Sequence, residues 1–378
     1  MEIGATEAAR DIFYYGRNSL KCAGNCGYDS LHDFTQEDNT IVGDLFQTYK
    51  LYYGQQSDYS SVEILQEIEK AEEESSYIFS SSLVSGLTQF MVMYMYPLKL
   101  MYSSLDYCDF NNVEASEKWD LAAASLIGSI EGNTLGINEE DTGTLLYSSL
   151  KQTCATFNTC YHNDFNDVKS LIYRLNQGKG HAFEGRCDLL KVQIESINSI
   201  LQAAMIQSTI YYALVLDSSS PDGVDDYTDD YSIDSGVSLG HAAGSAKASA
   251  MSVIPLVHVS DNLTTKKLNA MIESPQTVNA SVIINGFKAS APIMIGLNCD
   301  DIGELKDAGG FCLEKQSNDD NGSINSNLPG DSDEIKNVTN TVDDTIDIGN
   351  ESDGLSIDTK DTIVIDEIYE ISTDVSQM

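Results

Sequence analysis

The strongest pattern in the sequence is one apolar stripe between residues 189 and 216. Leu190, Ile194, Ile197, Leu201 and Ala204 follow one another at steps of four, three, four and three residues. This spacing places all five side chains on one face of an α-helix. At about 1.5 Å of rise per residue, the helix is roughly 40 Å long. A stripe this long has to be buried, so we expect the fold to be built around it.

Shorter helical patterns fill most of the chain up to residue 316. They lie at residues 41–53, 61–74, 83–105, 114–131, 167–176, 245–257 and 278–295. Long runs of alternating polar and apolar residues, which are typical of strands, do not occur. We expect Gly178 and Gly180 to break the chain before the long helix, and Pro221 to follow its end. The sequence predicts an all-α protein, a large helical bundle in which no linker divides residues 1–316.

The charge of the chain is strongly acidic and unevenly distributed. The 378 residues contain 59 Asp and Glu against 21 Lys and Arg, for a net charge of −38. This balance excludes nucleic-acid binding through neutralised phosphates and docking on anionic lipid through a basic patch. Residues 317–378 carry 16 acids and two Lys, a charge of −14, and residues 1–316 carry the other −24. We therefore expect two parts, a helical domain at 1–316 and a disordered acidic tail at 317–378.

The cysteines predict a disulfide-bonded domain. There are eight, and four pairs drawn from eight cysteines allow 105 connectivities. Cys22–Cys26, Cys154–Cys160 and Cys299–Cys312 close short loops and are the natural local candidates, which leaves Cys108 with Cys187. Zinc is the rival interpretation, but the chain contains no C-x-x-C pair.

Other local features favour a protein outside the cytosol. Glycosylation acceptors of the form Asn-x-Ser/Thr occur at Asn262, Asn279, Asn321, Asn337 and Asn350. The first ten residues, MEIGATEAAR, do not read as a signal peptide, so the expected secreted, periplasmic or cell-surface location assumes a signal that is not in this chain. The most apolar stretch, residues 83–102, is interrupted by polar residues, and we expect a buried helix there rather than a membrane span.

Six short stretches, in order along the chain, carry a resemblance to a known family. They are residues 9–16 (ARDIFYYG), 119–132 (WDLAAASLIGSIEG), 143–160 (GTLLYSSLKQTCATFNTC), 206–214 (IQSTIYYAL), 252–258 (SVIPLVH) and 298–305 (NCDDIGEL). Together they resemble the algal iron-assimilation family, the low-iron-inducible periplasmic proteins related to phytotransferrins. The resemblance implies a helical, disulfide-bonded extracellular or cell-surface protein connected with iron acquisition. We therefore expect a protein that binds or concentrates iron, with iron as its ligand and an uptake partner at the surface.

The chain departs from that family at one position of interest. The family carries an acidic residue about ten positions before the Pro of the SVIPLVH segment, and this chain has Ser245 there. A family ligand for a cation is therefore replaced by a neutral hydroxyl. The departure leaves a second hypothesis open, a structural or adhesive cell-surface glycoprotein that keeps the fold without a metal site.

Ferric iron prefers hard oxygen donors, which here are Asp, Glu and Tyr. Glu131 is the first candidate because it closes an apolar helical face, although an acid at a helix end also commonly points to water. Glu117 and Asp120 are three residues apart and share an ion if both face inward. His181 and Glu184 form a His-x-x-Glu pair that can reach one ion from a helix, a pattern that also arises by chance.

Other polar and aromatic residues are expected to be structural. His258 lies on an apolar face and is expected to be a core histidine, while His241 follows a loop and fits either role. Tyr147 and the pair Tyr211 and Tyr212 are expected to be core aromatics. No nucleophile elbow, P-loop, H-E-x-x-H or dinucleotide fingerprint occurs, so we expect a protein that is not an enzyme. An enzyme that uses paired acids is a third, weaker hypothesis.

Overall fold

The computed structural model describes residues 3–16, 29–35, 44–54, 58–71, 77–127, 146–159, 168–218, 238–274, 278–294, 297 and 299–303. These residues form helices and contain no β-strand, so the prediction of an all-α protein is confirmed. The helices are α1 (Ile3–Tyr15), α2 (Leu31–Thr35), α3 (Asp44–Tyr52), α4 (Tyr59–Lys70), α5 (Tyr77–Leu87), the π-helical segment η1 (Thr88–Val92), α6 (Met93–Cys108), α7 (Asn112–Ile127), α8 (Leu146–Thr156), α9 (Val168–Glu184), α10 (Cys187–Ser218), α11 (Leu239–Ser260), α12 (Asn262–Glu273), α13 (Ala280–Met294) and α14 (Cys299–Ile302). The expected tail at 317–378 lies outside the described residues.

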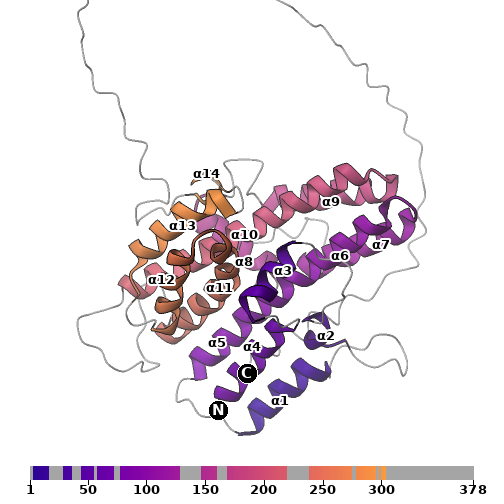
Figure 1. Cartoon of the computed structure of the whole chain (residues 1–378). Helices are drawn as coiled ribbons and strands as arrows, with labels where there is room; N and C mark the ends of the chain where they lie inside the picture. The colour runs from indigo at the N-terminus through magenta and orange to yellow at the C-terminus, as the bar shows by residue number, and fades with distance from the viewer. Residues whose placement is uncertain are drawn as a thin grey trace, which may run out of the picture. The chain divides into compact units, whose positions relative to one another are not determined.

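Helix α10 is the centre of the bundle. Leu190, Ile194, Ile197 and Leu201 have no exposed surface and Ala204 is 2% exposed, so the predicted stripe is buried along its length. Helices α6, α8, α9, α11, α13 and α14 all pack against α10 (Figure 1). The long helix around which we expected the fold to be built is confirmed.

A second long helical stretch runs without a break through α5, η1 and α6. It spans Tyr77–Cys108 and, like Cys187–Asp217 in α10, is long and apolar enough to cross a membrane by length and composition. In the most apolar window of each stretch, 61% and 78% of the residues respectively are buried inside the protein. The α10 stretch is therefore mostly buried in the bundle, and more than half of the window in Tyr77–Cys108 is buried too, where a buried helix was expected at residues 83–102.

The turns α6–α7 and α9–α10 are joined by covalent and polar contacts. Cys108 and Cys187 form a disulfide with their Cα atoms 5.7 Å apart. This is the pair that remained in the sequence analysis after the three short-range candidates were assigned. The amide of Asn112 donates to the carbonyl oxygen of Phe183 at 3.1 Å. Cys154 is also disulfide-bonded. Helices α6, α7 and α9 consequently lie side by side (Figure 1).

The prediction that Gly178 and Gly180 break the chain is wrong, because both lie inside α9. A Cβ atom at Gly178 would lie 1.9 Å from Cζ2 of Trp119, so the absence of a side chain there makes room for the indole of α7. The indole Nε1 donates to the carbonyl oxygen of Leu175 at 2.8 Å. The break comes instead at Gly185, whose φ of +67° is a left-handed conformation that favours glycine.

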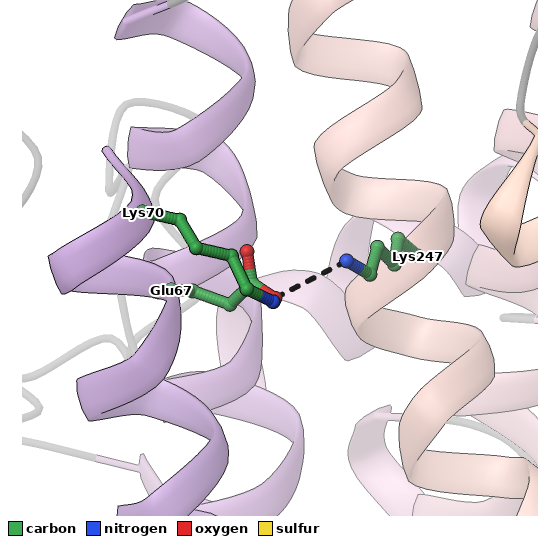
Figure 2. A network of polar contacts seen from close by, with 3 residues as sticks. All are labelled: Glu67, Lys70 and Lys247. Atoms are coloured by element: carbon green, nitrogen blue, oxygen red, sulfur yellow. Dashed lines mark hydrogen bonds and ion pairs between the residues drawn. The ribbon is translucent and has the colours of Figure 1, made fainter. Parts of the chain in front are cut away.

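A buried carboxylate ties α4 to α11. The side chain of Glu67 is 4% exposed, and its Oε1 accepts from Lys70 at 2.7 Å and from Lys247 at 3.2 Å. Figure 2 shows Lys247 reaching this carboxylate from the neighbouring helix. Lys247 also lies 5.9 Å from the ring centroid of Phe79. A buried charge needs such partners, so this ion pair links α4 to α11.

Candidate functional site

Within the described part of the chain, the residues predicted to ligate a metal do not form one site. Glu117 and Asp120 are both exposed on α7, so the condition that both face inward is not met. Asp120 instead accepts from Lys179 of α9 at 2.9 Å. Glu131 lies outside the described residues.

The His-x-x-Glu pair lies on α9, as its spacing predicts. His181 is half-buried, whereas Glu184 is exposed and forms an ion pair with Nε of Arg186 at 2.8 Å. No group of three or more His, Cys, Asp or Glu side chains able to hold a metal occurs among the described residues. Within this part of the chain, a metal site built from acids and histidines alone is therefore not present.

A polar cavity that is partly open to solvent lies between helices of the bundle. It has a volume of about 300 Å³ and is formed by the α5–η1 stretch together with α8, α10 and α11. Its lining carries eight Ser and Thr hydroxyls, two phenols, one imidazole and one amide, and no charged side chain. The lining residues are Ser81, Ser82, Ser85, Gly86, Gln89, Phe90, Ser149, Thr153, Thr156, Ser208, Tyr211, Tyr212, His241 and Ser245.

Two features of the backbone shape this cavity. The π-helical segment η1 contributes Gln89 and Phe90, and single-turn π segments inside α-helices are frequently found at functional sites. Helices α5 and α11 also approach closely beside it. A Cβ atom at Gly86 would lie 2.5 Å from that of Ala248. Small residues at this crossing bring Ser82 and Ser85 of α5 near His241 and Ser245 of α11.

The imidazole of His241 is held on one wall of the cavity. Ser238 is the N-cap of α11, and its hydroxyl accepts from the backbone N–H of His241 at 3.2 Å. The ring Nδ1 is 2.9 Å from Oγ of Ser82. With the proton on Nδ1 and donated to Ser82, the other nitrogen, Nε2, has a free lone pair, as in the usual arrangement of a metal-binding histidine. Burial lowers the pKa of His241, so the neutral ring is favoured at pH 7.

One of the two phenols, that of Tyr212, adjoins this imidazole. The ring of Tyr212 meets that of His241 edge-on with centroids 5.9 Å apart, and Tyr211 meets Tyr212 at 5.1 Å. Burial raises the pKa of Tyr212, and its hydrogen bond with Ser245 opposes part of that rise. Tyr211 and Tyr212 of α10 and His241 of α11 therefore all line one cavity.

Several sequence predictions are changed by this geometry. Tyr147 is buried, as expected for a core aromatic, but Tyr211 and Tyr212 are half-buried and line the cavity. His258, expected in the core, is exposed, and its ring meets that of Tyr52 edge-on at 5.3 Å. The missed cavity residues Ser82 and Ser85 belong to no motif. Ser149, Thr153 and Ser208, by contrast, fall in stretches that carry the resemblance described above.

Comparison with known proteins adds no relative. No protein-family model, no curated protein and no solved structure matches the chain.

Proposed function

We propose that this protein is a non-catalytic binding protein that takes up ferric iron as cargo in the hydroxyl-lined cavity. The observation that carries the proposal is the contact of Tyr212 of α10 with His241 of α11 at that cavity, which Tyr211 also lines. Phenolate oxygen is a hard donor suited to ferric iron, and neutral imidazole is a common additional ligand. Metal binding displaces the phenol protons, so a raised pKa of Tyr212 lowers the affinity without preventing coordination.

A location outside the cytosol is part of this proposal. The Cys108–Cys187 disulfide and the disulfide of Cys154 are typical of an oxidising compartment. The acceptors Asn262 and Asn279 are both exposed, so glycans can be attached there without disturbing the core. The function that follows is capture of iron at the cell surface, for delivery to an uptake partner.

Titration of the full-length, metal-free protein with ferric iron tests the proposal. Coordination by tyrosine produces a visible phenolate-to-iron charge-transfer band that rises to saturation. Tyr212→Phe removes one donor and is expected to lower the band and weaken binding by at least about tenfold, roughly one lost ligand interaction of 1.4 kcal/mol. Tyr173→Phe, at a tyrosine of α9 that is 61% exposed, is the matched control and should bind as the parent does. Absence of a saturable band in the parent protein would sink the iron proposal.

The second candidate is a structural or adhesive cell-surface glycoprotein without a metal site. Ser245 favours it, because this serine lines the cavity at the position where the resemblance implies an acid. The same titration decides between the two, since this candidate predicts no binding of iron while the fold and glycans remain intact.

A further inference from the structure

Exposed apolar side chains gather where the turns α6–α7 and α9–α10 meet. Phe110 and Val113 lie in and just after the first turn, and Phe183 and Leu189 lie just before and just after the second. A disulfide joins the two turns, so these four side chains belong to one surface, which we call the apolar tip. Their exposed fractions are 72% for Phe110, 65% for Phe183, 63% for Val113 and 45% for Leu189. Single exposed apolar side chains are ordinary, whereas several grouped together mark an interaction surface.

The apolar tip is held in place by contacts within the protein. The disulfide keeps the Cα atoms of its cysteines 5.7 Å apart. Across the two turns, the amide of Asn112 donates to the carbonyl oxygen of Phe183 at 3.1 Å. The ring of Phe110 packs against that of Tyr107 with centroids 5.5 Å apart. A surface that is ordered before binding loses little conformational entropy when a partner docks, and exposed aromatic side chains are the usual anchors of an interface.

The charges of the apolar tip indicate the charge of its partner. Each cysteine of the disulfide is followed by an exposed aspartate, Asp109 or Asp188. Among the described residues neither aspartate forms an ion pair, whereas the neighbouring Glu184 pairs with Arg186 at 2.8 Å. Interfaces match acidic groups on one side with basic groups on the other, which guides the encounter and fixes the orientation. Two unpaired acids beside an apolar group therefore favour a partner with basic side chains.

The same charges disfavour two other occupants. A second copy of the chain would bring two acidic tips together and oppose two net charges of −38. A membrane of anionic lipid attracts basic segments and repels this acidic one. A protein with complementary charge is the occupant that the acids favour.

We propose that the apolar tip is the docking surface for a partner protein whose own contact surface has an apolar centre flanked by lysine or arginine side chains. Phe110 and Phe183 enter the apolar centre of the partner, and Asp109 and Asp188 pair with its basic side chains.

This inference goes beyond the proposed function and does not depend on it. Leu189 of the apolar tip and Ser208 of the cavity both lie on α10, at positions 19 residues apart. At about 1.5 Å of rise per residue the two sites are separated by roughly 28 Å along this helix. A partner docked on the tip therefore leaves the cavity free to bind its own ligand.

The probe for the test is a fluorescent helical peptide with leucine on one face and lysine on the other. A matched peptide has glutamate in place of lysine, and binding to the full-length protein is measured by fluorescence anisotropy at low and physiological salt. We expect saturable binding of one Lys–Leu peptide per chain and no binding of the Glu–Leu peptide. The double variant Phe110→Ser, Phe183→Ser should weaken binding by at least about tenfold, because it removes both aromatic anchors. Asp109→Asn with Asp188→Asn should weaken it by about 3- to 10-fold at low salt and reduce its salt dependence.

Matched variants outside the apolar tip serve as controls. Tyr15→Ser with Tyr173→Ser removes two aromatic side chains that are 60% and 61% exposed. Glu7→Gln with Glu273→Gln removes two exposed acids, as the aspartate variant does. Both controls should bind the Lys–Leu peptide as the parent does. If the double phenylalanine variant lacks the helical circular dichroism of the parent, the single change Phe110→Ser replaces it, with an expected loss of about 3- to 10-fold.

The outcomes separate this proposal from its alternatives and from the proposed function. No saturable binding of the Lys–Leu peptide, or equal weakening by tip and control variants, overturns the docking surface. Binding to phosphatidylcholine vesicles, or a dimer in analytical ultracentrifugation, overturns it as well if either is lost with Phe110→Ser and Phe183→Ser, because the occupant is then lipid or a second copy. Tip variants should bind ferric iron as the parent does, and failure of the parent to bind iron leaves the docking surface in place.

Discussion

Two glycines of α9, Gly178 and Gly180, are predicted to respond in opposite directions to the same substitution. Replacing a glycine inside a helix by alanine normally stabilises the protein by about 0.8–1 kcal/mol. At Gly180 nothing lies within 4 Å of the added Cβ, so Gly180→Ala should give that full gain. At Gly178 the added Cβ would lie 1.9, 2.4 and 2.5 Å from three ring atoms of Trp119, so the ring has to move.

The cost at Gly178 follows from how firmly that ring is held. Trp119 has no exposed surface, and its indole N–H is bonded to the carbonyl oxygen of Leu175. Overpacking a core costs about 1–3 kcal/mol, and disturbing the hydrogen bond adds about 1 kcal/mol. After subtraction of the helix-propensity gain, Gly178→Ala should destabilise the protein by about 1–3 kcal/mol.

The assay is urea denaturation followed by tryptophan fluorescence, with disulfides intact. Trp119 is the only tryptophan of the chain, so the signal reports directly on the contact that is changed. Relative to the parent, the urea concentration at the unfolding midpoint should be lower for Gly178→Ala and higher for Gly180→Ala. The wavelength of maximum fluorescence of the folded protein should stay unchanged for Gly180→Ala and shift for Gly178→Ala. If both alanines stabilise the protein, the account of why α9 continues through Gly178 is refuted.

Three further outcomes are expected. Lys247→Met should lower the free energy of unfolding, measured by chemical denaturation, by about 1.5–3 kcal/mol, because it removes a charged hydrogen bond to buried Glu67. Lys70→Met, at a half-exposed lysine, should lower it by less than about 1 kcal/mol. Equal losses would contradict the role of Lys247 in linking α4 to α11. Glu63→Gln should stabilise the protein at pH 7, because burial and then Glu67 raise the pKa of Glu63, so its charged form disfavours folding. That gain should shrink as the pH falls through the raised pKa and the parent carboxyl takes up a proton, and a gain that grows on acidification would show the sign to be wrong. Replacing both cysteines of the Cys108–Cys187 disulfide by serine opens a loop with a sequence separation of 79 residues. The free energy of unfolding, measured by thermal or urea denaturation, should fall by about 2–4 kcal/mol. An unchanged stability would show that the bond does not constrain the unfolded chain.

Helix positions were predictable where periodicity was strong. The stripe from Leu190 to Ala204 identified α10, and the burial of those side chains follows from the stripe itself. Helix α12 was missed because its pattern is short and mostly polar. Its start is set by Asp261, whose carboxylate accepts from the backbone N–H groups of Leu263 and Thr264.

Predictions from residue type alone were wrong at positions whose structure is decided by a contact from elsewhere in the fold. Gly178 is a helix breaker by propensity, but a tryptophan 59 positions earlier occupies the space that its missing side chain leaves. His258 belongs to an apolar segment, but the face of α11 on which it lies is exposed. Neither fact is encoded near the residue concerned, so a local pattern could not supply it.

The candidate site shows the same division. The sequence by itself determined an acidic all-α protein with a long central helix, since periodicity and charge are local or countable properties. It offered Cys108–Cys187 as one pairing among many, and the structure showed that bond. Only the tertiary structure decided that the predicted acids on α7 face solvent and that Ser82, Tyr212 and His241 share a cavity. These three residues come from α5, α10 and α11, so their meeting depends on how closely the helices pack, which here depends on Gly86 and Ala248.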